Sequence, residues 1–155
     1  MASTISSANL KVKITEEIIL NGGDQGGTTE LTIGSINEIS KRITTITTTE
    51  ATILTFSAAV GQGTYIAADV RYLRFTNLDD TNHIMLTFKD EDNTEFRVKL
   101  DAGQSFIYNA DNSGGLVDTM KAAATALGSG LADLYDVTAD ADTDSCDLEI
   151  FIASA

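Results

Sequence analysis

The segment VRYLRFTNLDDTNHIMLTF, residues 70–88, consists of two apolar runs separated by a polar one. Apolar side chains recur at alternate positions, at Leu73 and Phe75 before the polar run and at Ile84 and Leu86 after it. This alternation predicts two β-strands, because successive side chains of a strand point to opposite faces of a sheet. The fold is therefore built on strands that bury one face.

The polar run NLDDTNH, residues 77–83, contains Asp79, Asp80 and the only histidine, His83. Asn, Asp and Thr side chains bond nearby backbone groups in turns. We therefore expect a β-hairpin tip joining two neighbouring strands, with His83 opening the second strand, in preference to a metal or catalytic cluster. The two aspartates are then candidate contacts with a neighbouring subunit.

Further strands are predicted by alternation and by runs rich in Thr, Ile and Val, which favour the pleated backbone. They cover residues 10–15, 29–34, 41–47, 51–56, 95–100, 104–109, 133–139 and 147–152. Clusters of Gly, Asn and Asp separate them. Short strands at this spacing indicate a β-sandwich, a jelly roll or a small barrel, and we favour an all-β antiparallel, jelly-roll-like sandwich.

The segment LVDTMKAAATAL, residues 116–127, departs from this pattern. It is rich in Ala, its apolar residues recur near helical spacing, and Gly128 follows it as a C-cap candidate. It predicts one short helix.

The domain organisation follows from length and from the first residues. A chain of 155 residues suits one domain, and MASTISSA is small and polar. We expect a flexible N-terminal arm over residues 1–9 and a single β-sandwich domain over 10–155. Since no apolar run has the length of a membrane span and no secretory signal is evident, we expect synthesis in the cytoplasm and no membrane partner.

The charge balance argues against nucleic acid as a partner. Ten basic residues stand against 23 acidic ones, a net charge of −13, and such a chain repels phosphates. The acid serves either solubility or docking on a basic surface.

The sequence offers little for catalysis or metal binding. One His and one Cys, Cys146, exclude an intramolecular disulfide and a standard zinc site, and we expect a half-buried structural thiol. Asp140, Asp142 and Asp144 begin like an EF-hand loop, but Ser145 stands where the loop requires Gly. We expect no enzyme and no cofactor, although a calcium site of another kind stays open.

Three strand residues suggest interactions. Arg71 and Arg74 lie among apolar neighbours, where each is expected to pair with an acid of its own chain or of a neighbouring subunit. Phe151 shares its strand face with acidic residues, so it marks either a subunit contact or a ring covered by another part of the chain.

Residues 70–110 combine RYLRFTNLD, IMLTF and EFRVKLDAGQSFIY with polar turns between them, and residues 134–153 read LYDVTADADTDSCDLEIFIA. This pattern resembles the small β-rich structural proteins of tailed bacteriophage virions, especially those of marine phages. The resemblance implies a non-enzymatic capsid decoration or cement protein that binds the major capsid protein and assembles with itself, with a trimer favoured.

The expected location is the virion, on the capsid surface, after synthesis in the host cytoplasm. The alternatives are a tail, neck or fibre-attachment module and a calcium- or carbohydrate-dependent binding domain. Candidate interface residues lie in the arm, the Gly-rich loop 21–27, the acidic turn and the last strand: Ser3, Thr4, Asn9, Gly22, Asp24, Gly26, Asp79, Asp80 and Phe151.

Overall fold

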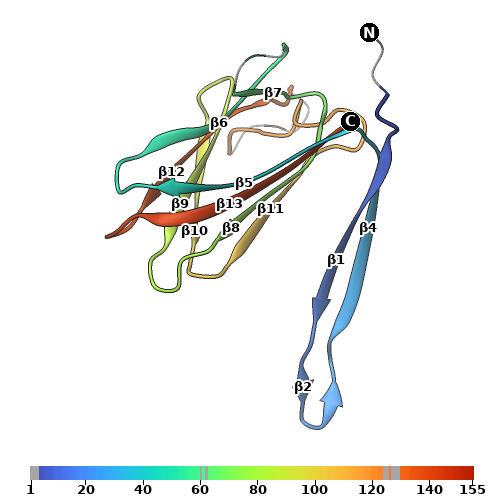
Figure 1. Cartoon of the computed structure of the whole chain (residues 1–155), viewed down its shortest axis with the longest axis vertical. Helices are drawn as coiled ribbons and strands as arrows, with labels where there is room; N and C mark the ends of the chain where they lie inside the picture. The colour runs from blue at the N-terminus through green and yellow to red at the C-terminus, as the bar shows by residue number, and fades with distance from the viewer. Residues whose placement is uncertain (1–3, 60, 62, 124–125, 127–129) are drawn as a thin grey trace.

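Two β-sheets pack face to face in the computed structural model, which describes residues 4–59, 61, 63–123, 126 and 130–155 (Figure 1). The four-stranded sheet has the order β11-β8-β13-β5, and the five-stranded sheet has the order β10-β9-β12-β6-β7. Only the β6–β7 pair is parallel among the described strand pairs. The strands are β5 (Glu38–Ile46), β6 (Ala51–Ser57), β7 (Thr64–Ile66), β8 (Val70–Asn77), β9 (Ile84–Asp90), β10 (Glu95–Leu100), β11 (Ser105–Asn109), β12 (Leu134–Ala141) and β13 (Cys146–Ser154). The predicted all-β, jelly-roll-like sandwich is confirmed.

The core lies between the two sheets, where the alternating residues of the sequence meet. Phe88 on β9 is fully buried and contacts four other aromatic rings. Its ring lies 5.6 Å from that of Phe75 on β8, edge to face, so this contact joins the two sheets. Most of the remaining core consists of buried Leu, Ile and Val side chains of both sheets.

The connection over residues 77–83 differs from its prediction. β8 pairs with β11 and β13, whereas β9 pairs with β10 and β12, so NLDDTNH joins strands of different sheets. The prediction of a hairpin between two neighbouring strands is therefore wrong. Alternation shows which face of a strand is buried, but both an arch and a hairpin satisfy it.

The predicted helix over residues 116–127 is also wrong within the described part of that range. Asp118 has a φ of 55°, which no right-handed helix accommodates, and Met120 forms an isolated β-bridge with Ala132. The Leu116 amide donates to the Ala67 carbonyl, and the Leu116 carbonyl accepts from the Leu134 amide. Leu116 therefore lies in a loop, and its side chain is buried in the core. Tertiary packing thus overrides the helix propensity of the segment. Among the described residues, no helix is long and apolar enough to cross a membrane.

A long β-hairpin projects from the sandwich (Figure 1). It consists of β1 (Ala8–Glu16) paired with β4 (Gly27–Ile36), and continues into the short pair β2 (Ile19–Leu20) and β3 (Gly23–Asp24). We expected the first two segments inside the sandwich, but they pair only with each other, outside both sheets. The strand also includes Ala8 and Asn9, which we had placed in the flexible arm.

Candidate functional site

The end of the projecting hairpin is a tight turn that its sequence explains. Asn21 and Gly22 link β2 to β3, with φ of 52° and 78°. Two consecutive left-handed residues form the type I′ turn that matches the twist of paired strands, and Asn-Gly is the preferred sequence for it. The hairpin therefore carries its own closing signal.

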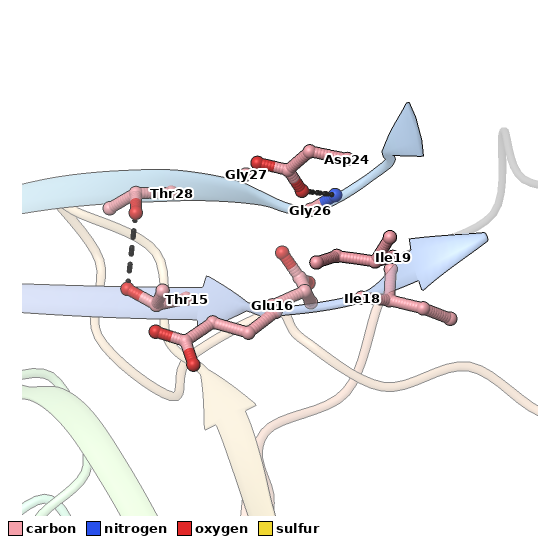
Figure 2. Close-up of a pocket in the computed structure, with 9 residues that line it drawn as sticks. Thr15, Glu16, Ile18, Ile19, Asp24, Gly26, Gly27 and Thr28 are labelled. Carbon is pink, nitrogen blue, oxygen red and sulfur yellow. Dashed lines mark hydrogen bonds between the residues drawn. The ribbon is translucent and has the colours of Figure 1, made fainter. Parts of the chain in front are cut away.

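The two backbone segments approach each other closely where β1 and β4 end and the tip begins (Figure 2). The Gly26 amide donates to Asp24 Oδ1 at 2.9 Å, and a Cβ on Gly26 would lie 2.1 Å from the Glu16 carbonyl oxygen. Only glycine fits such an approach. Just below, the hydroxyls of Thr15 and Thr28 lie 3.1 Å apart across the strands. These contacts fix the shape of the hairpin tip, which we define as residues 15–28.

The hairpin tip presents apolar side chains to solvent. The exposed fractions are 52% for Ile18, 76% for Ile19 and 59% for Leu20. The tip also carries Glu16, Glu17 and Asp24, and no Lys or Arg. The neighbouring hollow, about 570 Å³, is lined by both kinds of residue. Three adjacent exposed apolar residues on a protruding element are typical of a contact surface.

One face of the hairpin is apolar along its length. Cross-strand pairing places Leu10 opposite Ile33 and Val12 opposite Leu31, with Ile14 further along the same face. The exposed fraction rises along this face, from 4% at Ile33 to 41% at Leu31 and 46% at Ile14. The hairpin is thus packed at its base and free towards its tip.

The base of the hairpin packs on the outer face of the four-stranded sheet. Its basal cluster consists of Ile33, Ile36, Tyr72 and Ala153, with Phe151 against it. The rings of Tyr72 and Phe151 meet edge to face at 6.0 Å, and burial raises the pKa of the Tyr72 hydroxyl. Phe151 is therefore partly covered by another part of its own chain, and its role at a subunit interface stays a prediction.

Arg74 anchors the charged part of this face. Its guanidinium lies 5.9 Å from the centre of the Phe151 ring and donates to Glu149 Oε1 at 2.7 Å. This bond is the main cause that lowers the pKa of Glu149, with Lys41 as a further cause. The predicted pairing of Arg74 with an acid of its own chain is confirmed, whereas Arg71 donates to the backbone carbonyl of Ala68.

A cleft separates the part of the hairpin nearer its base, Leu10 to Ile14 on β1, from the four-stranded sheet. Its volume is about 620 Å³, and Lys11, Lys13 and Arg74 line it together with apolar side chains. The apolar lining residues come from β1, β8, β11 and β13: Leu10, Val12, Ile14, Tyr72, Ile107 and Phe151. The cleft combines apolar walls with positive charge.

The acidic turn after β8 is built around a buried amide. Asn77 Nδ2 donates to the carbonyls of Asn82 and Leu100, at 2.9 and 3.1 Å, and its Oδ1 accepts from the amide of Asp79. Asp79 in turn accepts from the amides of Asn82 and Thr81, which lowers its pKa. Asp79 is therefore structural, whereas Asp80 is exposed and stays a candidate contact.

The fold brings Cys146 near the backbone of His83 but not into a catalytic pair. Cys146 Sγ lies 3.9 Å from the His83 carbonyl, while the imidazole Nδ1 lies 3.4 Å from Asp142. Burial, followed by nearby aspartates, raises the pKa of the thiol. A thiol that resists ionisation is a poor nucleophile. The side chain is buried at the start of β13, more completely than we expected.

The acidic segment 140–144 does not gather its carboxylates around one point. Asp140 lies on β12 and pairs with Arg97, whereas Asp142 pairs with His83. Among the residues that the structure describes, no group of three or more His, Cys, Asp and Glu side chains could hold a metal ion.

The other candidate interface residues fall in two places. Thr4 and Asn9 are exposed near the start of β1, at the base of the hairpin, and Ser3 lies outside the described residues. Gly22, Asp24 and Gly26 all belong to the hairpin tip. Ile18, Ile19 and Leu20 were not among the predicted interface residues. Their signal in the sequence is the run EEIIL beside Asn21-Gly22, which breaks the alternation of the strand.

Comparisons with known proteins assign no family. No family model matches the chain, and no curated protein matches it. One solved structure, described as "Bacillus endospore appendages form a novel family of disulfide-linked pili", aligns with 100% of this chain and 95% of its own, at 10% identity and a TM-score of 0.42. Similarity at this level carries no functional argument.

Proposed function

We propose that the chain is a non-enzymatic virion structural protein that binds the capsid surface as a decoration or cement protein and stabilises the shell. The observation that supports a structural role is the projecting hairpin, whose tip holds Ile18, Ile19 and Leu20 in solvent beyond a well-packed sandwich. A folded body with a projecting hairpin that ends in exposed apolar residues is suited to linking adjacent subunits. The placement on a phage capsid comes from the resemblance of residues 70–110 and 134–153.

In this role the sandwich covers part of the shell, and the hairpin joins it to a neighbour. An interface of roughly 1,600 Å² is enough for specific attachment, and repeated symmetric contacts add avidity. The net charge of −13 favours a basic docking surface on the major capsid protein. The alternative placement is a tail, neck or fibre-attachment module, for which the same hairpin is equally suited.

Co-sedimentation tests the placement. The purified chain is mixed with expanded capsids and, separately, with tails of the phage that encodes it. We expect pelleting with capsids and not with tails, and weaker binding at high salt because the attraction is partly electrostatic. Binding to tails alone would replace the proposal by its alternative, and binding to neither would overturn both.

A matched pair of variants locates the contact. Asp80→Asn removes a charge at the turn after β8, and Asp92→Asn removes one at the exposed turn between β9 and β10. If the acidic turn touches the capsid, only Asp80→Asn weakens pelleting. Equal effects of the two variants would exclude Asp80 as a specific contact.

A further inference from the structure

The cleft between the hairpin base and the four-stranded sheet is positive in a strongly negative protein. Arg74 lines the wall formed by the sheet, and Lys41 lies next to Phe151 in the strand ladder. Lys11 and Lys13 border the cleft from the other face of β1, where they pair with Glu30. Two acids, Glu30 and Glu149, accept ion pairs from these four bases. The surroundings of the cleft therefore keep an excess of basic groups while the whole chain carries −13.

The hairpin tip has the opposite character. Its charged residues are Glu16, Glu17 and Asp24, and it contains no base to neutralise them. Its apolar residues Ile18 and Ile19 are more than half exposed. The tip thus matches the cleft in both charge and polarity.

The tip of a chain cannot occupy the cleft of the same chain. The cleft is lined by Leu10 to Ile14 on β1, and Ile19 lies further out along the same hairpin. At about 3.3 Å per residue, the strand carries the tip roughly 20 Å beyond Val12. Figure 1 shows the hairpin running outwards without turning back. A second copy of the chain can supply a tip.

We propose that the hairpin tip of one copy seats in the cleft of a second copy. Ile18 and Ile19 then cover the apolar walls at Leu10 and Ile107, while the tip carboxylates approach Arg74 and Lys41 on the sheet side of the cleft. The contact joins two different surfaces, so each copy both gives a tip and receives one, and the assembly closes into a ring or extends as a filament. This inference rests on the proposed structural role and adds the identity of the neighbour.

Analytical ultracentrifugation of the purified full chain tests the association. We expect concentration-dependent association of the wild type that weakens with added salt. Ile19→Asp should weaken it by roughly tenfold to a hundredfold, because it places a charge where an apolar side chain is buried. The matched control is Tyr135→Asp, at an exposed residue of the five-stranded sheet, and it should associate as the wild type does. Far-ultraviolet circular dichroism verifies that both variants fold.

Disulfide trapping tests which surfaces meet. A chain with Ile19→Cys and Ile107→Cys should form covalent oligomers on oxidation, whereas a chain with Ile19→Cys and Tyr135→Cys should not. The natural Cys146 is buried and does not interfere.

A monomeric wild type at all concentrations, unchanged association of Ile19→Asp, or equal trapping in the two double variants would overturn the inference. These measurements use no phage particle. Capsid binding can therefore fail while the chain still self-associates, and the two proposals fail separately.

Discussion

The sandwich and the projecting hairpin use the same alternating sequence pattern with different outcomes. In β8 and β9 the apolar positions Leu73, Phe75 and Ile84 are fully buried between two sheets. In the hairpin the apolar face is buried at Ile33 and largely open at Ile14. Alternation therefore identifies a strand with one apolar face. Whether a second sheet packs on that face decides whether it becomes part of the core or a contact surface.

The two regions also differ in what keeps them folded. The sandwich is stabilised by a continuous core, whereas an isolated two-stranded hairpin is marginal in water. The projecting hairpin depends on its basal cluster, on the Asn21-Gly22 turn and on ion pairs such as Lys13–Glu30. Substitutions should thus act globally in the sandwich and locally in the hairpin.

The largest effect is expected from Phe88→Ala in the core. Removing a fully buried ring that contacts four others should lower the free energy of unfolding by about 3–5 kcal/mol. Denaturant-induced unfolding measures the loss. Phe96→Ala is the control, because that ring stacks on Phe88 at 4.9 Å but is partly exposed, and its loss should be smaller. Equal losses would contradict the central position of Phe88.

A smaller loss is expected from Asn77→Ala at the arch between the sheets. The substitution leaves the buried carbonyl of Leu100 without its side-chain donor and should cost about 1–3 kcal/mol. Unfolding in denaturant reports the change. Thr81→Ala, at an exposed position of the same arch, should change stability by less than about 0.5 kcal/mol. If both variants lose the same free energy, the buried amide is not the element that holds the arch.

A substitution at the hairpin base should destabilise the hairpin without destabilising the sandwich. Phe151→Ala removes the ring on which Tyr72 and the hairpin base pack, at a cost of about 1–2 kcal/mol for a half-buried side chain. We expect faster hydrogen exchange of the β1 and β4 amides and unchanged exchange of the β9 and β12 amides. Ile43→Ala, at an exposed site on β5, is the control and should leave both unchanged. Faster exchange throughout the molecule would show that the hairpin and the sandwich unfold together.

The strands of the sandwich could be predicted because local pattern is enough for them. Every strand segment expected from alternation and β-branched runs is a strand, including the segments of β8, β9 and β13. The pairing could not be predicted, because β8 and β9 are adjacent in sequence yet belong to different sheets. Pairing depends on long-range packing, which alternation within one segment does not report.

The site was predicted in part. The Gly-rich loop was recognised as a contact candidate and lies at the hairpin tip, whereas the projection of β1 and β4 has no local signal. Their alternation is as regular as that of core strands. Lys11 and Lys13 occupy the face of β1 opposite to its apolar residues, as polar residues do on the outer face of a core strand. The helix over 116–127 fails for a related reason. Its Ala-rich composition reports propensity, while Leu116 and Met120 are drawn into the core.

The smallest effect is expected from Asp136→Asn, which changes a partly buried acid of the sandwich. The acids of the hairpin tip, by contrast, lie in solvent. Asp136 on β12 has a carboxylate oxygen without a hydrogen-bond partner among the described residues, and burial raises its pKa, with Glu95 and Glu50 adding to the rise against Lys89. A raised pKa means that the fold favours the protonated acid, so this contribution is present at low pH and is lost as the pH rises through the folded pKa. Asp136→Asn mimics the protonated form and should stabilise the protein by up to about 1 kcal/mol at pH 7 and by less at pH 4.

Thermal unfolding at the two pH values measures this difference between the sandwich and the hairpin. Glu17→Gln removes an exposed acid at the hairpin tip and should change stability by less than about 0.5 kcal/mol at either pH. Because Asp136 lies between the β6 and β9 strands and Glu17 lies in solvent, only the first variant should show a gain that grows with pH. A gain at pH 4 as large as that at pH 7 would mean that the amide improves packing or bonding, and that the ionised carboxylate of Asp136 costs the fold nothing.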